Sequence, residues 1–300
     1  NEMLALLKHG LEDISASRSR FDWGVAFPSP LSNGETQTMY VWFDALPNYL
    51  TGTGFPAKGY KDKWPAQLHV IGKDITRFHA IIWPAMLQSA ELPLPERVWS
   101  HGFVLFGGER FSKSAGVKFD VNQAIDYYGP DALRYFLLRE IPFDTDGTFS
   151  WERFDEVYNS ELANSWGNLV SRAVSMVEKY CGSVVPGAPA GQLDAGDKPD
   201  IAAYRTAMDG AMGYLLHDAI RSVMACAARG NEFVQASAPW ALAKSPESRS
   251  SLEHVLGELI RALARNCVLL FPFMPAKAQA AWEQLGGPGN VGDQRLDGPL

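Results

Sequence analysis

The sequence is short of cysteine, of long apolar runs and of positive charge, and each shortage excludes a class of protein. Only three cysteines occur in 300 residues, Cys181, Cys226 and Cys267, and no two of them form a C-x-x-C pair. Neither a disulfide framework nor a zinc knuckle is therefore encoded, and no metal site is expected in this chain. Such cysteine usage fits a reducing cytosol, so we expect a cytoplasmic protein.

No segment predicts membrane insertion or secretion. The most apolar run, residues 267–274, is interrupted by Pro272, whereas a membrane-spanning helix needs about 20 apolar residues. The N-terminal residues do not combine a basic flank with an apolar core in the manner of a signal peptide. We therefore expect no membrane partner.

Positive charge is in deficit, because the formal net charge is -7. Phosphate binding relies on concentrated Lys and Arg, so this sum argues mildly against a nucleic-acid partner. The sum does not say where the charges lie, however. Charge alone would fit an acidic globular protein that binds no nucleic acid, and the motifs have to decide.

The chain has enough apolar residues for a sizeable core, at 46% hydrophobic and 20% charged, and divides into regions of different pattern. Within residues 1–120, strand-like segments alternate with a helix, which indicates a parallel α/β sheet. The strands are expected at 39–43, 68–71 and 98–106, and the helix at 74–90.

The rest of the chain is predicted to be mainly helical. Residues 121–155 form a mixed connector, in which Pro130 and Asp131 suit the first turn of a helix that continues to Leu138. A Gly- and Pro-rich break is expected at 182–199. Helices are expected at 155–181, 200–236, 248–271 and 275–285.

A lysine between two serines follows the third strand-like segment, in the run Arg110, Phe111, Ser112, Lys113 and Ser114. Glycines flank the run on both sides, which predicts a loop whose cation can reach nucleotide phosphates and neutralise charge on a leaving group. Taken alone, the run would also fit a surface loop.

Two residues follow the second strand, at the edge where parallel α/β sheets bind ligands. Gly72 lets a ligand approach the backbone, and Asp74 can cap the following helix while it accepts hydrogen bonds from ribose hydroxyls. The alternative is that Asp74 only caps the helix.

The same helix and an earlier segment carry residues that can line one small apolar pocket. Ile75, His79 and Trp83 recur at a spacing of four on one helix face. Trp42, Ala45, Leu46 and Tyr49 repeat that kind of spacing in a second element. Core packing is the alternative, since a histidine on such a face is more often a core residue and large aromatics are commonly buried for stability.

In the helical region, Asn168 and Arg172 lie one turn apart, and Trp240 follows a proline further along. The amide and the guanidinium can bond an unstacked base edge, while the indole offers a stacking platform. A solvated helix face is the alternative for the two polar residues.

These motifs together resemble those of the class I methionyl-tRNA synthetases over residues 13–286, and the run at 110–114 resembles the KMSKS signature of that family. The resemblance implies an α/β plus all-α fold: the second half of a Rossmann-like nucleotide-binding domain at 1–120, a stem-contact connector at 121–155 and a helical anticodon-binding domain at 156–300. It implies a methionine-tRNA ligase that uses ATP with Mg²⁺ as the substrate complex and binds a tRNA with the methionine anticodon.

Family positions assign roles to individual residues. The methionine site is implied at Trp42, Ala45, Leu46, Tyr49, Ile75, His79 and Trp83. The ATP site is implied at Gly72, Asp74, His101, Gly102, Val104, Ser112, Lys113 and Ser114. Catalytic cations are implied at Lys113 and Arg110, with Arg18 as a further candidate, and anticodon contacts at Asn168, Arg172 and Trp240. Arg110 and Phe111 depart from the first two positions of the signature.

No H-x-G-H sequence occurs, although the family carries a histidine motif of this kind after its first strand. The first half of the sheet and the zinc-bearing insertion have no counterpart either. We therefore expect a C-terminal part of such an enzyme that does not activate methionine by itself. The alternative is a tRNA-binding module without catalysis, but the methionine pocket and Lys113 favour the enzyme. Oligomeric state is not indicated.

Overall fold

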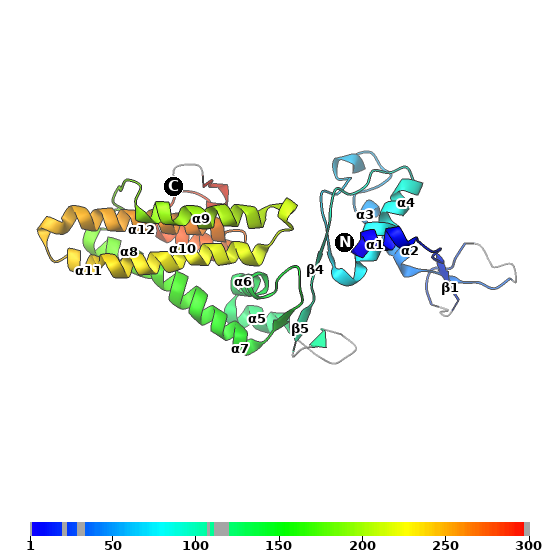
Figure 1. Cartoon of the computed structure of the whole chain (residues 1–300), viewed down its shortest axis with the longest axis horizontal. Helices are drawn as coiled ribbons and strands as arrows, with labels where there is room; N and C mark the ends of the chain where they lie inside the picture. Colours follow the sequence, from blue (N-terminus) through cyan, green and yellow to red (C-terminus); the bar gives the residue numbers. More distant parts are fainter. Residues whose placement is uncertain (1, 20–22, 29–33, 107–108, 111–119, 297–300) are drawn as a thin grey trace. The chain divides into compact units, whose positions relative to one another are not determined.

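A computed structural model describes residues 2–19, 23–28, 34–106, 109–110 and 120–296 (Figure 1). The chain divides into two compact units, Asn1–His101 and Gly102–Leu300. Unit 1 combines helices with paired strands, whereas unit 2 is mainly helical. This agrees with the predicted α/β region followed by a helical one, while the three-part division at residues 120 and 155 stays a prediction.

Unit 1 is built on two parallel strands. β3 (His69–Gly72) pairs with β4 (Val98–His101), and Gly72 lies opposite His101. A helical crossover joins them, as parallel strands require, and the predicted α/β pattern is confirmed at this point. The crossover consists of a 3-10 helix (Lys73–Ile75), a π-helix (Phe78–Ile82) and α4 (Trp83–Ser89). The other elements are α1 (Glu2–His9), β1 (Ser17–Arg18), β2 (Thr38–Met39), α2 (Val41–Ala45), α3 (Asn48–Thr51) and a 3-10 turn (Tyr60–Asp62).

The prediction of a strand at 39–43 is wrong after Met39, because residues 41–45 form α2. Valine and aromatic side chains favour strands as a local tendency, but tertiary packing overrides such tendencies. Here the Trp42 ring stacks on Phe78, with the ring centroids 4.6 Å apart and the planes 16° from parallel. A helical turn places Trp42 on the crossover, next to a core made of Leu46, Leu50, Trp64, Trp83 and Leu87.

Unit 2 begins with a small sheet and continues into helices. β5 (Val104–Phe106) pairs with β6 (Glu109–Arg110) antiparallel and with β7 (Gly147–Phe149) parallel. The connector helices are α5 (Val121–Tyr128), α6 (Pro130–Glu140) and α7 (Trp151–Val157). The later elements are a π-helix (Tyr158–Gly167), α8 (Asn168–Cys181), α9 (Gln192–Met208), α10 (Leu216–Ser237), α11 (Pro239–Leu242), α12 (Arg249–Leu270) and α13 (Pro275–Gln284), with 3-10 turns at Gly210–Met212, Pro246–Ser248 and Val291–Asp293.

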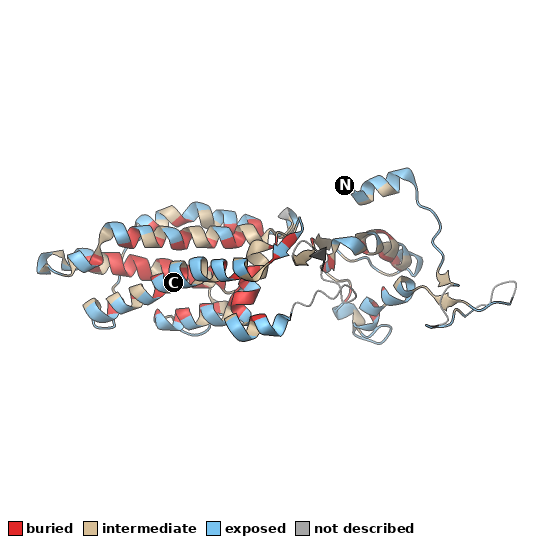
Figure 2. Cartoon of the chain, turned by 90° about the horizontal axis from the view of Figure 1, so that it is seen from below, coloured by how far each residue is buried: buried red, intermediate tan, exposed pale blue. Residues whose placement is uncertain are grey.

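One apolar core runs through unit 2 from the connector to the last helix. In Figure 2 the buried residues follow the facing sides of the long helices. The helices predicted at 155–181, 248–271 and 275–285 are confirmed, with the first continuous from α7 through the π-helix to α8. The helix expected from Pro130 is confirmed as α6.

The single strand predicted at 98–106 is interrupted at Gly102 and Phe103. Gly102 N donates to Phe143 O at 3.0 Å, and Phe103 N donates to Asp146 Oδ1 at 2.8 Å. Both donors are therefore engaged by a neighbouring loop rather than by a strand partner. A continuous apolar run does not reveal such a break, since the partner that redirects the chain lies about 40 residues away.

The predicted break at 182–199 is too long, because α9 begins at Gln192 and contains Pro199. A local cap and a tertiary contact fix its start: Asp194 Oδ2 accepts from Gly191 N at 2.8 Å, and Glu258 of α12 accepts from Leu193 N. The helix predicted at 200–236 is likewise divided, at residues 209–215, where Gly213 has φ +95°. Caps and buried partners outweigh the local cost of proline in α9.

Buried and half-buried ion pairs tie α9 to α10 and α12. Asp194 binds Arg261 at 2.6 Å and also Arg265, while Asp197, 1% exposed, binds Arg229 and Arg265. Burial raises the pKa of the Asp194 carboxyl, but hydrogen bonds from Arg261 and Gly191 and the charge of Arg265 outweigh burial and lower the pKa to about 2. A carboxyl with a depressed pKa stabilises the fold once it is ionised.

No helix in the described ranges is long and apolar enough to cross a lipid bilayer.

We expect Asp194→Asn to lower the free energy of unfolding of unit 2 by about 2 kcal/mol at pH 7, because two arginines lose a half-buried carboxylate partner. Urea unfolding of the full chain, followed by circular dichroism, measures this loss. The folded pKa of about 2 lies below the ordinary 3.8, so the contribution is present above about pH 4 and is lost as the pH falls toward 2. The difference in the free energy of unfolding between parent and variant should therefore be smaller at pH 3 than at pH 7.

Glu253→Gln is the matched control, since it removes an exposed carboxylate paired with Arg249 within α12. Its effect should stay within about 0.5 kcal/mol. A gap between parent and Asp194→Asn that does not change with pH would contradict the role assigned to the ionised carboxyl.

Candidate functional site

Aromatic rings from α2, α3 and the crossover meet in unit 1. The Tyr49 ring lies 5.6 Å from the His79 ring and 6.2 Å from Trp83, measured between centroids. Trp42 contacts the His79 ring edge-on at 6.3 Å. The structure thus brings together four of the seven residues predicted for the methionine site.

A chain of hydrogen bonds fixes the His79 ring, which is 1% exposed. His79 Nδ1 lies 3.0 Å from Ile75 O, and His79 Nε2 lies 2.8 Å from the Tyr49 hydroxyl. Because a carbonyl oxygen only accepts, Nδ1 carries the proton, and Nε2 accepts from the hydroxyl. Burial raises the pKa of Tyr49, so the hydroxyl remains a donor near neutral pH.

The other predicted pocket residues differ in exposure. Leu46 and Trp83 are 1% exposed and belong to the core of unit 1. Ala45 is exposed at the end of α2, and Ile75 is half-buried. Leu46 and Trp83 therefore pack as core residues, and for Trp83 this is the alternative that the sequence allows. Trp42, Tyr49 and Ile75 retain exposed surface.

Gly72 and Asp74 lie where β3 ends, as the sequence predicts. A Cβ on Gly72 would lie 2.9 Å from Asp74 Oδ1, so a side chain at residue 72 would crowd this carboxylate. Gly72 itself is the N-cap of the 3-10 helix, and no side chain caps that helix. The structure thus does not support the alternative that Asp74 only caps the helix, and the Asp74 side chain is exposed in the first turn. His101 lies opposite Gly72 on β4.

Arg18 lies in β1, paired with Thr38 of β2. Its guanidinium carbon is 3.5 Å from the centroid of the Tyr40 ring, the N-cap residue of α2. Both side chains line a cavity of about 830 Å³ that Asp44 also lines. The structure thus places this candidate cation beside the element that carries Trp42.

The remaining predicted ATP-site residues belong to unit 2 or fall outside the description. Gly102 and Val104 lie at the start of unit 2. Arg110 ends β6, of which the structure describes the backbone. Ser112, Lys113 and Ser114 lie outside the described residues.

In unit 2, Asn168 and Arg172 occupy the first two turns of α8, and Trp240 lies in α11. The Arg172 guanidinium carbon is 5.9 Å from the centroid of the Trp240 ring, within the range of a cation–π contact. Asn168 is exposed, and Trp240 is 37% exposed. Elements far apart in the sequence thus bring the guanidinium and the indole together on the surface.

His69, the first residue of β3, belongs to the aromatic group although no sequence pattern singles it out. Its ring centroid is 4.4 Å from that of Tyr49 and 6.0 Å from that of His79. Alternation along β3 places His69 and Ile71 on the buried side, and this period-2 signal could have indicated burial but not the neighbours.

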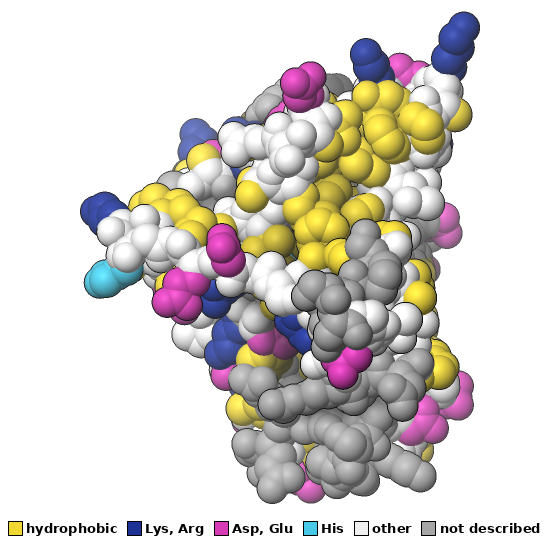
Figure 3. Space-filling model, turned by 90° about the vertical axis from the view of Figure 1, so that its right-hand side faces the viewer, with side chains coloured by type: hydrophobic (Ala, Val, Ile, Leu, Met, Phe, Trp, Pro, Cys, Tyr) yellow, Lys and Arg dark blue, Asp and Glu magenta, His cyan; other side chains and the backbone are white. Residues whose placement is uncertain are grey.

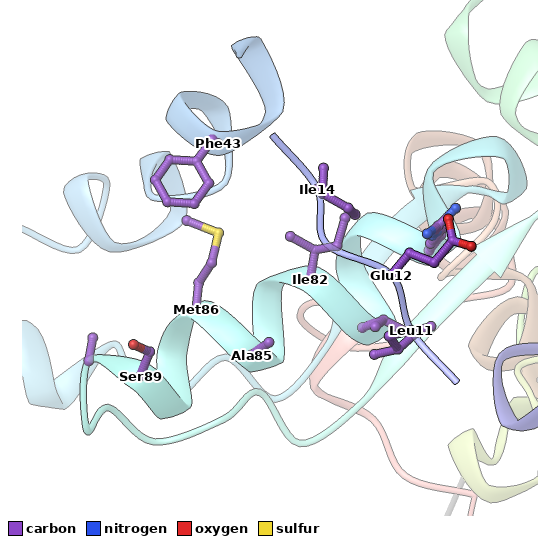
Figure 4. A pocket seen from close by; sticks show the side chains of 11 residues that line it. Leu11, Glu12, Ile14, Phe43, Ile82, Ala85, Met86 and Ser89 are labelled. Carbon is purple, nitrogen blue, oxygen red and sulfur yellow. The ribbon is translucent and has the colours of Figure 1, made fainter. Parts of the chain in front are cut away.

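A separate groove of about 470 Å³ lies against α4, and none of the predicted residues lines it. Figure 4 shows Leu11 and Ile14 of the N-terminal segment facing Ile82, with Phe43 near Met86. Several other large hydrophobic side chains of unit 1 are exposed, Val70 among them at 56%, and a group of hydrophobic side chains is visible on the surface in Figure 3.

Among the residues that the structure describes, no group of three or more His, Cys, Asp or Glu side chains is placed to hold a metal ion.

Similarity to known proteins identifies the family. A family model described as tRNA synthetases class I (M) matches residues 1–174, more than half of the chain. The chain belongs to this family. It is 41% identical over 293 residues to the methionine-tRNA ligase of Caldanaerobacter subterraneus subsp. tengcongensis, covering 95% of this chain and 45% of that protein. It is 43% identical over 286 residues to the corresponding ligase of Rhizobium meliloti, covering 93% and 54%.

The chain is also similar to solved structures of methionyl-tRNA synthetases. The methionyl-tRNA synthetase of Mycobacterium tuberculosis in complex with methionyl-adenylate is 37% identical, with a TM-score of 0.84, and the match covers 96% of this chain and 57% of that one. A free form of the same enzyme matches with a TM-score of 0.79 at 35% identity. The chain thus spans about half the length of the relatives it matches.

Gly102 is predicted to belong to the ATP site, and its close packing in unit 2 can be tested by substitution. A Cβ there would lie 1.9 Å from Thr145 O, a backbone atom that cannot move aside cheaply. We expect Gly102→Ala to lower the free energy of unfolding of unit 2 by about 3 kcal/mol or more, measured by urea unfolding.

Gly187→Ala is the control, because its Cβ would meet nothing within 4 Å, and its effect should stay within about 0.5 kcal/mol. Equal stability of the two variants would show that the close approach at Gly102 is relaxed in solution.

Proposed function

We propose that this chain provides methionine-, ATP- and tRNA-binding parts of a methionine-tRNA ligase. The observation that carries the proposal is the aromatic group of unit 1, in which the Tyr49 hydroxyl bonds a buried His79. Membership of the class I (M) family supports the reaction class. Its relatives are named methionine-tRNA ligases.

The pocket suits the side chain of methionine. Trp42, Tyr49 and His79 offer ring edges and faces, with which a thioether sulfur interacts favourably at about 0.3–1.5 kcal/mol per contact. Ile75 supplies an apolar wall, and His79 keeps a defined tautomer through Ile75 O. Ala45, Leu46 and Trp83 complete the proposed set, the last two as the packed support behind the rings.

The proposed chemistry is adenylate formation. A carboxylate oxygen of methionine attacks the α-phosphorus of ATP, supplied as its Mg²⁺ complex, and the bond to the bridging oxygen of pyrophosphate breaks in line.

We assign binding of the ribose hydroxyls to Asp74, with Gly72 leaving space for the ligand. Contacts with adenine are assigned to His101, Gly102 and Val104. Lys113 and Arg110, with Ser112, Ser114 and Arg18, are proposed to stabilise the charge on the phosphates.

The acceptor of the methionyl group is proposed to be the terminal ribose of a tRNA with the methionine anticodon. Asn168 can bond a base edge, and Trp240 can stack a base while it lies within cation–π range of Arg172. The family of the chain and the exposed placement of Asn168 and Trp240 support this assignment.

Ile75→Ala tests the amino-acid pocket. Enlarging the wall should weaken L-methionine binding to the full chain by about tenfold or more, because each methylene in an apolar pocket contributes about 1–3 kcal/mol. Ligand-observed NMR titration with L-methionine measures the affinity, and the bulkier ethionine should lose less.

Ile81→Ala is the matched control, since Ile81 lies in the same crossover, in the π-helix that follows, but lines the separate groove. An equal loss in both variants would assign the effect to the stability of unit 1. No methionine binding by the parent chain would overturn the pocket, and tRNA binding in its absence would favour a non-catalytic module.

Trp240→Ala tests the tRNA surface. Loss of a stacked base costs about 1–3 kcal/mol, so binding of a tRNA with the CAU anticodon should weaken roughly 5- to 150-fold, measured by filter binding. Asn168→Ala and Arg172→Ala should show the same selectivity. A tRNA with an altered anticodon should bind parent and variants alike.

Arg221→Ala provides the control for charge, because Arg221 is 65% exposed on α10 and pairs with Asp218. It should cause at most a small loss that is equal for both tRNAs. Equal losses for both tRNAs in Trp240→Ala would assign this residue to the fold rather than to anticodon recognition.

A further inference from the structure

His69 is a buried histidine that none of the roles assigned above uses. It begins β3 and is 5% exposed. Three aromatic rings surround it, those of Tyr49 at 4.4 Å, His79 at 6.0 Å and Trp64 at 6.1 Å between centroids. It is closer to the Tyr49 ring than either His79 or Trp83 is.

The ring of His69 acts as a neutral aromatic ring in this position. Its Nε2 is buried and has no hydrogen-bond partner within the described residues. Burial lowers the pKa of His69, and the nearby His79 lowers it further. A protonated imidazole would need partners for two N–H groups, so the neutral form is the one that fits this environment. Keeping a buried nitrogen without a partner carries a free-energy cost, which calls for an explanation beyond stability.

Tyr49 is the residue on which His69 can act. It lies on the four-residue helix α3 and keeps 36% of its surface exposed, so its own helix restrains it weakly. Its hydroxyl nevertheless has to meet His79 Nε2 at 2.8 Å. A ring in contact with His69, His79 and Trp83 has few orientations left. The position of the His69 ring therefore affects the position of the Tyr49 ring and, through the Tyr49 hydroxyl, that of His79.

We propose that His69 is a positioning residue for the methionine pocket, whose ring fixes Tyr49 so that the Tyr49 hydroxyl holds His79 in its binding orientation. This inference rests on the proposed function of the pocket. It assigns the effect to the ring of His69 and not to its nitrogens. The ring packs against Tyr49, and of these three residues only Tyr49 and His79 are assigned substrate contact.

Two substitutions separate the ring from the nitrogens. His69→Asn removes the ring and keeps a side-chain nitrogen, whereas His69→Phe keeps a ring and removes both nitrogens. The first readout is the pKa of Tyr49, followed in the full chain by NMR of its ring carbon bonded to the hydroxyl. The second readout is the affinity for L-methionine. Leu87→Ala, in the same core and 1% exposed, controls for a general loosening of unit 1.

In His69→Asn the Tyr49 pKa should fall toward its ordinary value of 10.0, and L-methionine binding should weaken about tenfold, as expected when an aromatic contact is lost. His69→Phe should restore most of the rise in the Tyr49 pKa and most of the affinity for L-methionine. Leu87→Ala should lower the unfolding midpoint yet leave the Tyr49 pKa in place.

The outcomes separate this inference from the function on which it rests. If the parent chain binds methionine and His69→Asn changes neither quantity, the positioning role is overturned while the pocket stands. If His69→Phe behaves like His69→Asn, the nitrogen is required and the role of the ring is overturned. If the parent chain binds no methionine, the pocket and this role within it both fail, whatever the Tyr49 pKa shows.

Discussion

Unit 2 depends on one apolar core that the connector and the helical bundle share. Tyr135 and Phe136 of α6, Phe149 of β7 and Phe154 of α7 are all 0% exposed, and their rings join the same cluster as the long helices. Polar contacts close its edge, where the Tyr135 hydroxyl and Arg139 both bind Glu161 of the π-helix. Because this π-helix leads directly into α8, the same core sets where Asn168 and Arg172 begin. A substitution that loosens the connector core would therefore disturb the proposed tRNA surface, although the substituted residue lies outside that surface.

Both proposed binding regions adjoin a π-helix, and this backbone form often accompanies function because it is costly to keep. Phe78–Ile82 carries His79, and Tyr158–Gly167 precedes Asn168. Each adds backbone to a turn and so rotates the side chains that follow. In unit 1 the result is that His79 is buried under Tyr49, with both of its ring nitrogens engaged. A regular helix of the same sequence would present a different face to α2 and α3.

Charge explains why composition is a poor guide to the partner of this chain. The formal net charge of -7 does not say which charges are engaged inside the fold, as Asp194 and Asp197 are with Arg265. These pairs hold α9 to α12. Arg172, in contrast, lies beside an exposed indole. Recognition of nucleic acid rests on such local placement, which a summed charge does not report.

The sequence alone determined the parallel crossover between β3 and β4, the helical character of unit 2 and the group of Trp42, Tyr49 and His79, because apolar spacing and family motifs are local properties of the chain. Only the tertiary structure decided that Val41 to Phe43 are helical, that α9 begins at Gln192 and that Gly102 interrupts a strand. It alone placed His69 against Tyr49. In each of these cases the deciding partner lies far away in the sequence: Phe78 for Trp42, Glu258 for Leu193 and Thr145 for Gly102. Local propensities are worth less than a buried contact or a cap, so packing between distant segments overrides them wherever the two disagree.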